Sequence, residues 1–144
     1  MLIRDLLKNQ VTVSADRAQT VLEVAGLMVE HNIGAVPVLE GGRLVGIFSE
    51  RDLMRRVVVA GRNPERTPVH EVMTDDPLTV KPTEEVATCM TLMRRHGFRH
   101  IPVCDGRALV GVVSLRDILL HDLNEKDDEV RMMRAYLHST PDAS

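Results

Sequence analysis

Two short motifs in this chain combine a hydroxyl and a carboxylate at a spacing that suits the first turn of a helix. They are Ser49-x-x-Asp52 and Ser114-x-x-Asp117, and they stand 65 positions apart. A helix N-terminus offers free N–H groups and the positive end of the helix dipole, and both attract phosphate. A carboxylate in the same turn can accept hydrogen bonds from both hydroxyls of a ribose, while the serine hydroxyl can contact ribose or phosphate. The motif therefore has the chemistry of a nucleotide site, and the chain contains it twice.

A purely structural explanation competes with this hypothesis. In a capping box, the serine accepts a hydrogen bond from the third amide of the helix and the acid bonds back to the backbone of the serine, with no ligand involved. The arginines that precede the aspartates, Arg51 and Arg116, also have two explanations. They are either solvated residues of an exposed helix face or bidentate partners of phosphate oxygens. The duplication favours binding, and both explanations stay open.

The two motifs belong to a longer internal repeat. Residues 33–53 and 98–118 align without a gap at the offset of 65, and the matched pairs include Pro37 with Pro102 and Gly46 with Gly111. A repeat of this length indicates two copies of one structural unit, so it determines how the rest of the chain is interpreted.

The elements of one unit follow from the pattern of apolar residues. Residues 35–39 and 44–48 are apolar runs joined by a Gly-Gly turn, which predicts a hairpin. From Thr20, apolar residues recur at i, i+3, i+4 and i+7, which predicts an amphipathic helix that ends at Asn32. Residues 49–59 predict a further helix. In the second copy, Gly97 takes the capping place of Asn32.

The regions outside the hairpins are less regular. Residues 11–13 alternate and are β-branched, which predicts a short strand before a polar loop at 14–19. Residues 78–80 look like the same strand, at an offset of 67, which implies a longer loop in the first copy. Residues 61–68 are polar and broken by proline, as a linker is. The acids that follow Asn124 predict the start of a C-terminal helix, and a frayed tail is expected from residue 139.

Composition excludes several classes of function. With 18 Lys and Arg against 21 Asp and Glu, the net charge is −3, which gives no general attraction to nucleic acid or an anionic membrane. Only 2% of residues are aromatic, so few side chains can stack on single-stranded bases. No secretion signal and no apolar run long enough to cross a bilayer are found. Two cysteines are too few for a disulfide framework, and we expect a cytoplasmic protein with reduced thiols.

Metal binding and nucleophilic catalysis find little support. His96, His100 and Cys104 are spaced by four, but they run from a helix end into a strand, which is no regular zinc spacing. Cys89 lies on the apolar face of its helix, where a buried thiol fills space in the core and is chemically inert. No serine has a histidine and an acid in a recognised order. We expect no metal site and no enzymatic activity.

The repeat resembles the cystathionine β-synthase (CBS) domain. The resemblance rests on an apolar-Pro-Val strand, a Gly turn, and then Gly, two apolar residues, Ser, two residues and Asp, in both copies and in order over nearly all of residues 1–123. It implies an α/β (α+β) fold of two βαββα repeats packed sheet to sheet with pseudo-twofold symmetry, plus a C-terminal helix. The implied division is 1–60 for the first repeat, 61–68 for the linker, 69–123 for the second repeat and 124–144 for the C-terminal helix and tail. The chain looks like a stand-alone tandem-CBS protein of bacterial type.

The resemblance also implies a set of ligand-binding residues. Members of the family bind adenosine-containing ligands in two clefts, and the matching aspartate is the ribose ligand. Basic residues just before the apolar-Pro-Val strand contact phosphate, a role that falls to Arg99 and His100, whereas the first copy has Gly34 and Ala35 there. The two clefts should therefore be unequal, and the one reached by Arg99 and His100 should prefer phosphorylated ligands. Strand ends contact adenine, which adds a final group of candidates: Thr12, Val13, Thr79 and Val80.

Two functions remain in competition. The first is a non-catalytic sensor that binds AMP, ADP or ATP, with S-adenosylmethionine or NAD as alternative ligands, requires no cofactor, and signals to an unidentified regulated protein. The family resemblance implies a homodimer of such modules. The second is a structural or interaction scaffold whose clefts are vestigial. Saturable binding that Asp52→Ala or Asp117→Ala abolishes separates the two.

Overall fold

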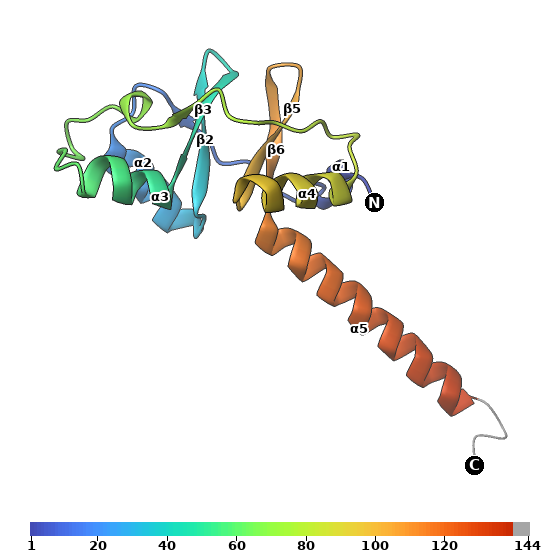
Figure 1. The fold of residues 1–144 in the computed structure, drawn as a ribbon. Helices are drawn as coiled ribbons and strands as arrows, with labels where there is room; N and C mark the ends of the chain where they lie inside the picture. The colour runs from blue at the N-terminus through green and yellow to red at the C-terminus, as the bar shows by residue number, and fades with distance from the viewer. Residues whose placement is uncertain (140–144) are drawn as a thin grey trace.

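The computed structural model describes residues 1–139, which form two α/β repeats and a long C-terminal helix (Figure 1). In chain order the elements are α1 (Ile3–Leu6), β1 (Ala15–Asp16), α2 (Val21–His31), β2 (Ala35–Glu40), β3 (Arg43–Ser49), α3 (Glu50–Asp52), η1 (Leu53–Val58), η2 (Val69–Glu71), β4 (Thr74–Asp75), α4 (Val86–His96), β5 (His100–Asp105), β6 (Ala108–Ser114) and α5 (Leu115–Ser139). The mixed α/β fold of two repeats with a C-terminal helix, expected from the sequence, is confirmed.

The sheet shows the symmetry of the two repeats. Its strand order is β1-β2-β3-β6-β5, with β4 beside β3. Both hairpins are antiparallel, with Ala35 opposite Ser49 in one and His100 opposite Ser114 in the other. They meet at a single residue pair between β3 and β6. Because the order β2-β3-β6-β5 is unchanged when the repeats are exchanged, the two units are related as a pseudo-twofold axis requires.

The predicted helix ends and turn are confirmed. Thr20 begins α2, and its Oγ1 accepts a hydrogen bond from the Glu23 amide at 3.2 Å. Asn32 ends α2 in the left-handed conformation with φ 51°, and Gly97 ends α4 with φ 72°. These caps satisfy backbone groups that a helix end leaves unpaired. They also fix where β2 and β5 begin, which is where the clefts described below open.

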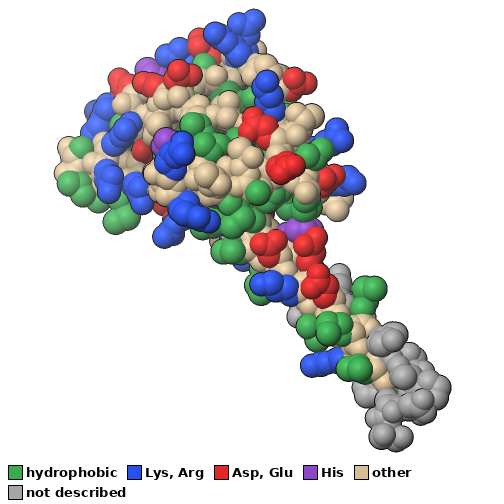
Figure 2. Space-filling view, turned by 45° about the vertical axis from the view of Figure 1, so that its right-hand side comes forward, with side chains coloured by type: hydrophobic (Ala, Val, Ile, Leu, Met, Phe, Trp, Pro, Cys, Tyr) green, Lys and Arg blue, Asp and Glu red, His purple; other side chains and the backbone are tan. Residues whose placement is uncertain are grey.

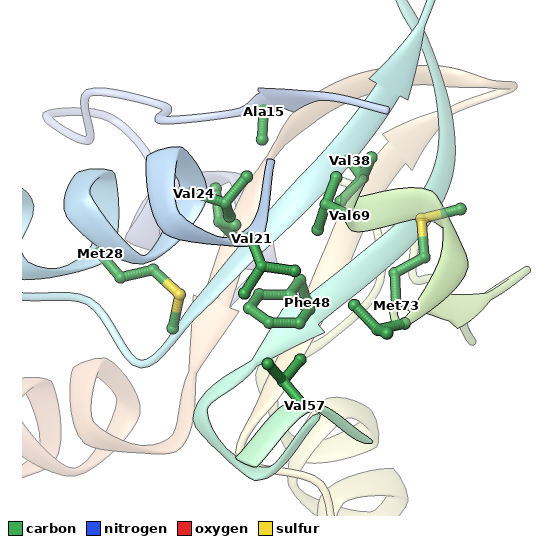
Figure 3. Packing of buried hydrophobic residues seen from close by; sticks show 11 residues of the cluster. Ala15, Val21, Val24, Met28, Val38, Phe48, Val57, Val69 and Met73 are labelled. Atoms are coloured by element: carbon green, nitrogen blue, oxygen red, sulfur yellow. The ribbon is translucent and has the colours of Figure 1, made fainter. Parts of the chain in front are cut away.

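The first repeat is held by an aliphatic core around one aromatic ring (Figure 3). Phe48 of β3 is 0% exposed, and it lies among Val21 and Val24 of α2 and Val57 of η1. Burial of each such side chain stabilises the fold by about 1.5–3 kcal/mol. Because Ser49 directly follows Phe48 and Asp52 lies in the next helical turn, the core fixes the position of the first Ser-x-x-Asp motif.

Each repeat is completed by a segment that precedes the other one in the chain. Ile3 of α1 is buried in the core of the second repeat, and its amide donates to the Glu84 carbonyl at 2.9 Å. Figure 1 shows α1 beside α4. Conversely, Val69 of η2 is buried in the core of the first repeat, and its amide donates to the Gln19 carbonyl at 2.8 Å. The two repeats are therefore interlocked.

The predicted strands at residues 11–13 and 78–80 are wrong. The first strand is β1, whose Ala15 pairs in parallel with Val38. In the second repeat, only Val80 pairs, with Val103. Both partners are offset by 65, so the repeat keeps one offset and the longer loop does not exist. The Val-Thr-Val and Leu-Thr-Val triplets are similar in letters, but pairing with β2 or β5 decides which residues are strand.

The C-terminal helix also begins earlier than predicted. Helix α5 is continuous from Leu115 to Ser139, so Asn124 lies within it and is not its start. Acidic residues favour a helix start, but they are also common on the solvent-exposed face within a helix. Figure 2 shows acidic side chains on α5 near the body and hydrophobic ones further along. The predicted helix at 49–59 is α3 followed by the π-helix η1. Residues 140–144 of the predicted tail lie outside the described residues.

Candidate functional site

Two clefts lie between the repeats, and each contains one Ser-x-x-Asp motif. The Asp52 cleft has a volume of about 450 Å³. The Asp117 cleft is larger, at about 880 Å³. Each combines the helix start of one repeat with the beginning of the hairpin of the other, as the pseudo-twofold symmetry requires.

The Asp52 cleft brings together five of the predicted residues, from the first repeat's motif and from the start of the second repeat's hairpin. Ser49, Arg51 and Asp52 line one side, and Arg99 and His100 line the other. Four apolar residues add to its walls, two from the segment that follows β4 and two from the start of β5 and the segment before it: Pro77, Leu78, Phe98 and Pro102. A flat, partly apolar ligand with a polar end matches these walls.

The Asp52 carboxylate is already engaged within the protein. Its Oδ2 accepts hydrogen bonds from the amide and hydroxyl of Ser49 at 3.0 and 3.1 Å. The hydroxyl of Thr74 donates to Oδ1 at 3.3 Å, and Arg56 Nε lies 3.7 Å from the same oxygen. Asp52 is only 8% exposed. The capping box is thus formed in full at this motif, as its purely structural explanation requires.

Asp117 differs from Asp52 although it occupies the equivalent position. Its amide donates to Ser114 Oγ at 3.0 Å, so the serine caps α5 as predicted. Its side chain is exposed, and within residues 1–139 no hydrogen bond or ion pair engages its carboxylate. This half-formed capping box leaves a free acceptor at the start of a 25-residue helix. Asp117 is therefore the aspartate that is available to a ligand.

The Asp117 cleft contains the other predicted residues. Thr12, Val13 and Arg116 line it together with Ser114 and Asp117. The opposite wall is the start of the first hairpin, residues 32–35. The Thr12 hydroxyl donates to the Val110 carbonyl at 3.3 Å, which holds the segment against β6. The segment that was wrongly predicted as a strand is thus a cleft wall.

Arg99 and His100 do not distinguish the clefts in the way the sequence predicted. Both residues line the Asp52 cleft and the Asp117 cleft, whereas the sequence assigned them to one cleft alone. The reason is their place at the start of β5, close to the pseudo-twofold axis, where the two clefts back onto each other. Burial lowers the pKa of His100 below its usual 6.5, although the neighbouring Glu50 and Asp117 carboxylates oppose that shift.

The predictions for Thr79 and Val80 require correction. Val80 is 1% exposed and belongs to the core of the second repeat. Thr79 is exposed and lines neither cleft. The residues that do line the Asp52 cleft from this segment are Pro77 and Leu78. With the offset of 65, Leu78 is the counterpart of Val13, so the correct register would have found it.

Sequence reasoning also missed Glu50 and Phe98. Glu50 lines both clefts, and Phe98 lines the Asp52 cleft, where its ring stacks on His96 at a centroid distance of 5.3 Å. Phe98 is the counterpart of Ile33, which lines the Asp117 cleft. Symmetry between the repeats was the available signal, since each residue that lines one cleft points to its partner in the other.

The described residues show no second kind of reactive centre. Among residues 1–139, no three His, Cys, Asp or Glu side chains are placed to hold a metal ion. Burial, with a smaller effect from Glu84, raises the pKa of the Cys89 thiol to about 11, so this cysteine stays protonated at neutral pH. Its predicted burial in the helix face is confirmed. In the same part of the chain, no helix has the length and apolar character that crossing a membrane requires.

Comparison with known proteins agrees with this architecture. The family model of the CBS domain matches residues 3–59 and again residues 69–124. The CBS domain-containing protein YhcV of Bacillus subtilis is 37% identical over 125 residues, which cover 86% of this chain and 87% of YhcV.

Two structures of similar fold were solved in complex with adenosine-containing ligands. The CBS domain protein PAE2072 from Pyrobaculum aerophilum, complexed with AMP, is 31% identical, has a TM-score of 0.74, and the match covers 81% of this chain and 89% of that one. The CBS domain pair of protein MJ0100, in complex with 5-methylthioadenosine and S-adenosyl-L-methionine, is 25% identical with a TM-score of 0.78 and coverage of 87% and 98%.

Proposed function

This chain belongs to the CBS domain family, and from that premise we propose that it is a non-catalytic regulatory module that binds a phosphorylated adenosine ligand. AMP, ADP or ATP is the proposed ligand class, and the Asp117 cleft is the proposed primary site. The ligand shifts the relative packing of the two repeats, and a partner protein responds to that shift.

The observation that carries the proposal is the free carboxylate of Asp117. The carboxylate stands at the start of α5, in a cleft of about 880 Å³. Among the described residues, no group forms a hydrogen bond or an ion pair with it. Two adjacent ribose hydroxyls can both donate to one carboxylate, and hydrogen bonds to a charged acceptor are the stronger kind. The same cleft contains the segment with Thr12 and Val13, whose backbone and apolar side chain suit the edge and face of an adenine ring.

Basic groups in the same cleft support a phosphorylated ligand. Arg99, Arg116 and His100 line it, against the acidic groups Glu50 and Asp117. An arginine guanidinium can pair with two phosphate oxygens at once. The relative solved with AMP supports a nucleotide, while the relative solved with 5-methylthioadenosine and S-adenosyl-L-methionine shows that similar folds accept adenosine without phosphate. S-adenosylmethionine and NAD are therefore the competing ligands in the test below.

The helix starts give the proposed signal a physical route. The amide of Leu115, the first residue of α5, donates to the Arg99 carbonyl at 2.8 Å, and the amide of Glu50 donates to the Gly34 carbonyl at 3.0 Å. Each hairpin is thus tied to the helix that carries the aspartate of the same repeat. A ligand that contacts Arg99 and Asp117 would act on both ends of this link, and coupling of this kind is typically worth 1–3 kcal/mol.

A second copy of the chain is the proposed partner for the exposed helix faces. Met54 and Val58 of η1 are 65% and 67% exposed, and their counterparts at the offset of 65, Leu119 and Leu123 of α5, are 48% and 60% exposed. Apolar residues exposed at matching places in both repeats suit a symmetric partner. Light scattering after size exclusion tests this, and a monomer at all concentrations would contradict it.

The alternative is an interaction scaffold with vestigial clefts. The closed network around Asp52 favours it for that cleft alone, because a carboxylate already engaged by Ser49 and Thr74 has little to offer a ribose. The scaffold hypothesis needs the same to hold at Asp117, where the carboxylate is free.

Isothermal titration decides between these functions. The full chain is titrated with AMP, ADP, ATP, NAD and S-adenosylmethionine, beside Asp117→Ala and the matched control Asp105→Ala, an exposed aspartate at the tip of the second hairpin that lines neither cleft. We expect saturable binding of a phosphorylated adenosine that weakens at least about tenfold in Asp117→Ala and is unchanged in the control. Folded, nucleotide-free protein that binds none of the five ligands would instead establish the scaffold.

A further inference from the structure

The two clefts share one wall. Four residues line both of them: Ala35, Glu50, Arg99 and His100. Ala35 stands opposite Ser49 in the first hairpin, and His100 stands opposite Ser114 in the second. The shared wall, defined by these four residues, therefore adjoins both Ser-x-x-Asp motifs.

The shared wall has no room for a second set of basic side chains from the first repeat. A Cβ atom placed on Gly34 would lie 3.2 Å from Cε1 of His100 and 3.5 Å from the carboxylate carbon of Glu50. The imidazole and the carboxylate thus converge on the one position where the chain has no side chain. At the offset of 65, the counterpart of Gly34 is Arg99 and that of Ala35 is His100. At this place the first repeat therefore has two small residues, and the second repeat has an arginine and a histidine.

This asymmetry leaves one set of basic groups for two clefts. Each cleft has an arginine of its own, Arg51 or Arg116, but Arg99 and His100 serve both. A guanidinium that pairs with a phosphate on one side of the wall cannot form the same bidentate pair on the other side. Two phosphates held on either side of the shared wall also repel each other, and the carboxylate of Glu50, which lines both clefts, repels each of them.

We propose that the two clefts compete for Arg99, so that a chain that holds one phosphorylated ligand binds a second much more weakly. This inference rests on the proposed function, because it concerns the same clefts and the same class of ligand. The Asp117 cleft wins the competition, since Asp117 is free and Asp52 is not. The second ligand binds about 5- to 150-fold more weakly than the first, the range typical of coupled sites.

The coupling has a direct structural route as well. The Leu115 amide, at the start of α5, donates to the carbonyl of Arg99, so a shift of Arg99 toward one cleft moves the helix start that carries Asp117. Occupancy of the Asp52 cleft would draw Arg99 away from that position. The same link makes the effect reciprocal, as thermodynamic linkage requires.

Titration with AMP, with the number of sites counted per chain, tests the competition. The wild-type chain is compared with Arg99→Ala and with Arg95→Ala, an exposed arginine of α4 that lines neither cleft. We expect one tight site and one site at least about fivefold weaker in the wild type and in Arg95→Ala. In Arg99→Ala we expect the tight site to weaken and the ratio between the two affinities to shrink, because the difference between Asp52 and Asp117 remains while the competition for Arg99 is gone.

The outcomes separate this inference from the function on which it rests. Two sites of equal affinity in the wild type overturn the competition and leave the proposed function standing. One site in the wild type and still only one in Arg99→Ala also overturns it, because the second cleft then does not bind at all. Absence of any AMP, ADP or ATP binding overturns the proposed function itself. Urea midpoints of the three proteins, measured alongside, show whether each variant is folded.

Discussion

The side chain of Gln10 takes the place of a β-strand beside Val112. Its Nε2 donates to the Val112 carbonyl at 2.8 Å, and its Oε1 accepts from the Val112 amide at 3.0 Å. In the first repeat, the counterpart residue Ile47 pairs with the backbone of Thr74 in β4. One carboxamide therefore provides in the second repeat what a two-residue strand provides in the first.

Removal of this carboxamide should destabilise the protein although Gln10 is not a core residue. In Gln10→Ala, both backbone groups of Val112 lose their partner in a partly buried place, and we expect a loss of about 1–3 kcal/mol in the free energy of unfolding. Urea denaturation measures it. Lys8→Ala, a change at an exposed neighbour in the same segment, is the control and should stay within about 0.5 kcal/mol. Equal effects of the two changes would show that the carboxamide does not act as a strand.

Two glycines should respond to alanine in opposite directions. A Cβ on Gly46 would collide with the side chain of Met73, whose Cγ and Cε lie 2.9 Å from that position and which is buried. Overpacking of this kind costs about 1–3 kcal/mol. Around Gly26, in the middle of α2, nothing lies within 4 Å of the added Cβ. Gly26→Ala should therefore stabilise by about 0.5–1 kcal/mol, and a Gly46→Ala protein as stable as wild type would refute the collision.

The two aspartates should separate stability from binding. Asp52→Ala breaks the capping box and leaves the hydroxyls of Ser49 and Thr74 without their acceptor, so we expect a loss of about 1–3 kcal/mol in the absence of ligand. Asp117→Ala should change the stability by less than about 0.5 kcal/mol, while it weakens ligand binding at least about tenfold. Thermal melts without ligand and titrations with AMP measure the two effects. The reverse pattern would assign the functional role to Asp52.

His100 should contribute a pH dependence of stability. Burial lowers its pKa in the folded protein below 6.5, its value in the unfolded chain. Between these two pKa values the unfolded state binds more protons, so stability falls as the pH falls below 6.5 and levels off once the pH passes the folded-state pKa. The loss from pH 7.5 to pH 5.5 should be smaller in His100→Gln than in wild type, with the other histidines as a common background. Identical losses would mean that His100 titrates as it does in the unfolded chain.

The interlocked N-terminal segment should be as important as the core it completes. Ile3→Ala removes a side chain that is 0% exposed and packs in the second repeat, at an expected cost of about 2–5 kcal/mol. Val11→Ala, eight residues later and 83% exposed, should have almost no effect. Chemical denaturation of both variants makes the comparison. Equal stability would show that the first ten residues are dispensable.

The hairpins, the helices and both motifs were predictable because each is specified locally. Phe48, Ser49 and Asp52 indicate a buried strand, a cap and a helix start within five positions. The structure has these three features at the same residues. The same is true of Asn32 and Gly97 as helix ends. Patterns of this kind depend on neighbours in the chain.

The mistakes concern features that depend on distant partners. Ala15 and Val80 are strand residues only because they pair with β2 and β5, so the triplets that contain Thr12 and Thr79 misled the alignment. The difference between Asp52 and Asp117 is equally invisible, since it depends on Thr74, which lies 22 positions away. The placement of Arg99 between both clefts follows from the pseudo-twofold axis, which no single motif shows.

The interlocking of the repeats also sets an order of events during synthesis on the ribosome. Chains lengthen by roughly 5–20 residues per second, so Ile3 leaves the ribosome several seconds before Glu84, its backbone partner, exists. The first repeat can close once Val69 has emerged, while the apolar turn around Ile3 still has nothing to pack against. The N-terminal segment is thus the first part of the protein to be made and among the last to be buried, and it is the part that a nascent-chain chaperone would meet exposed.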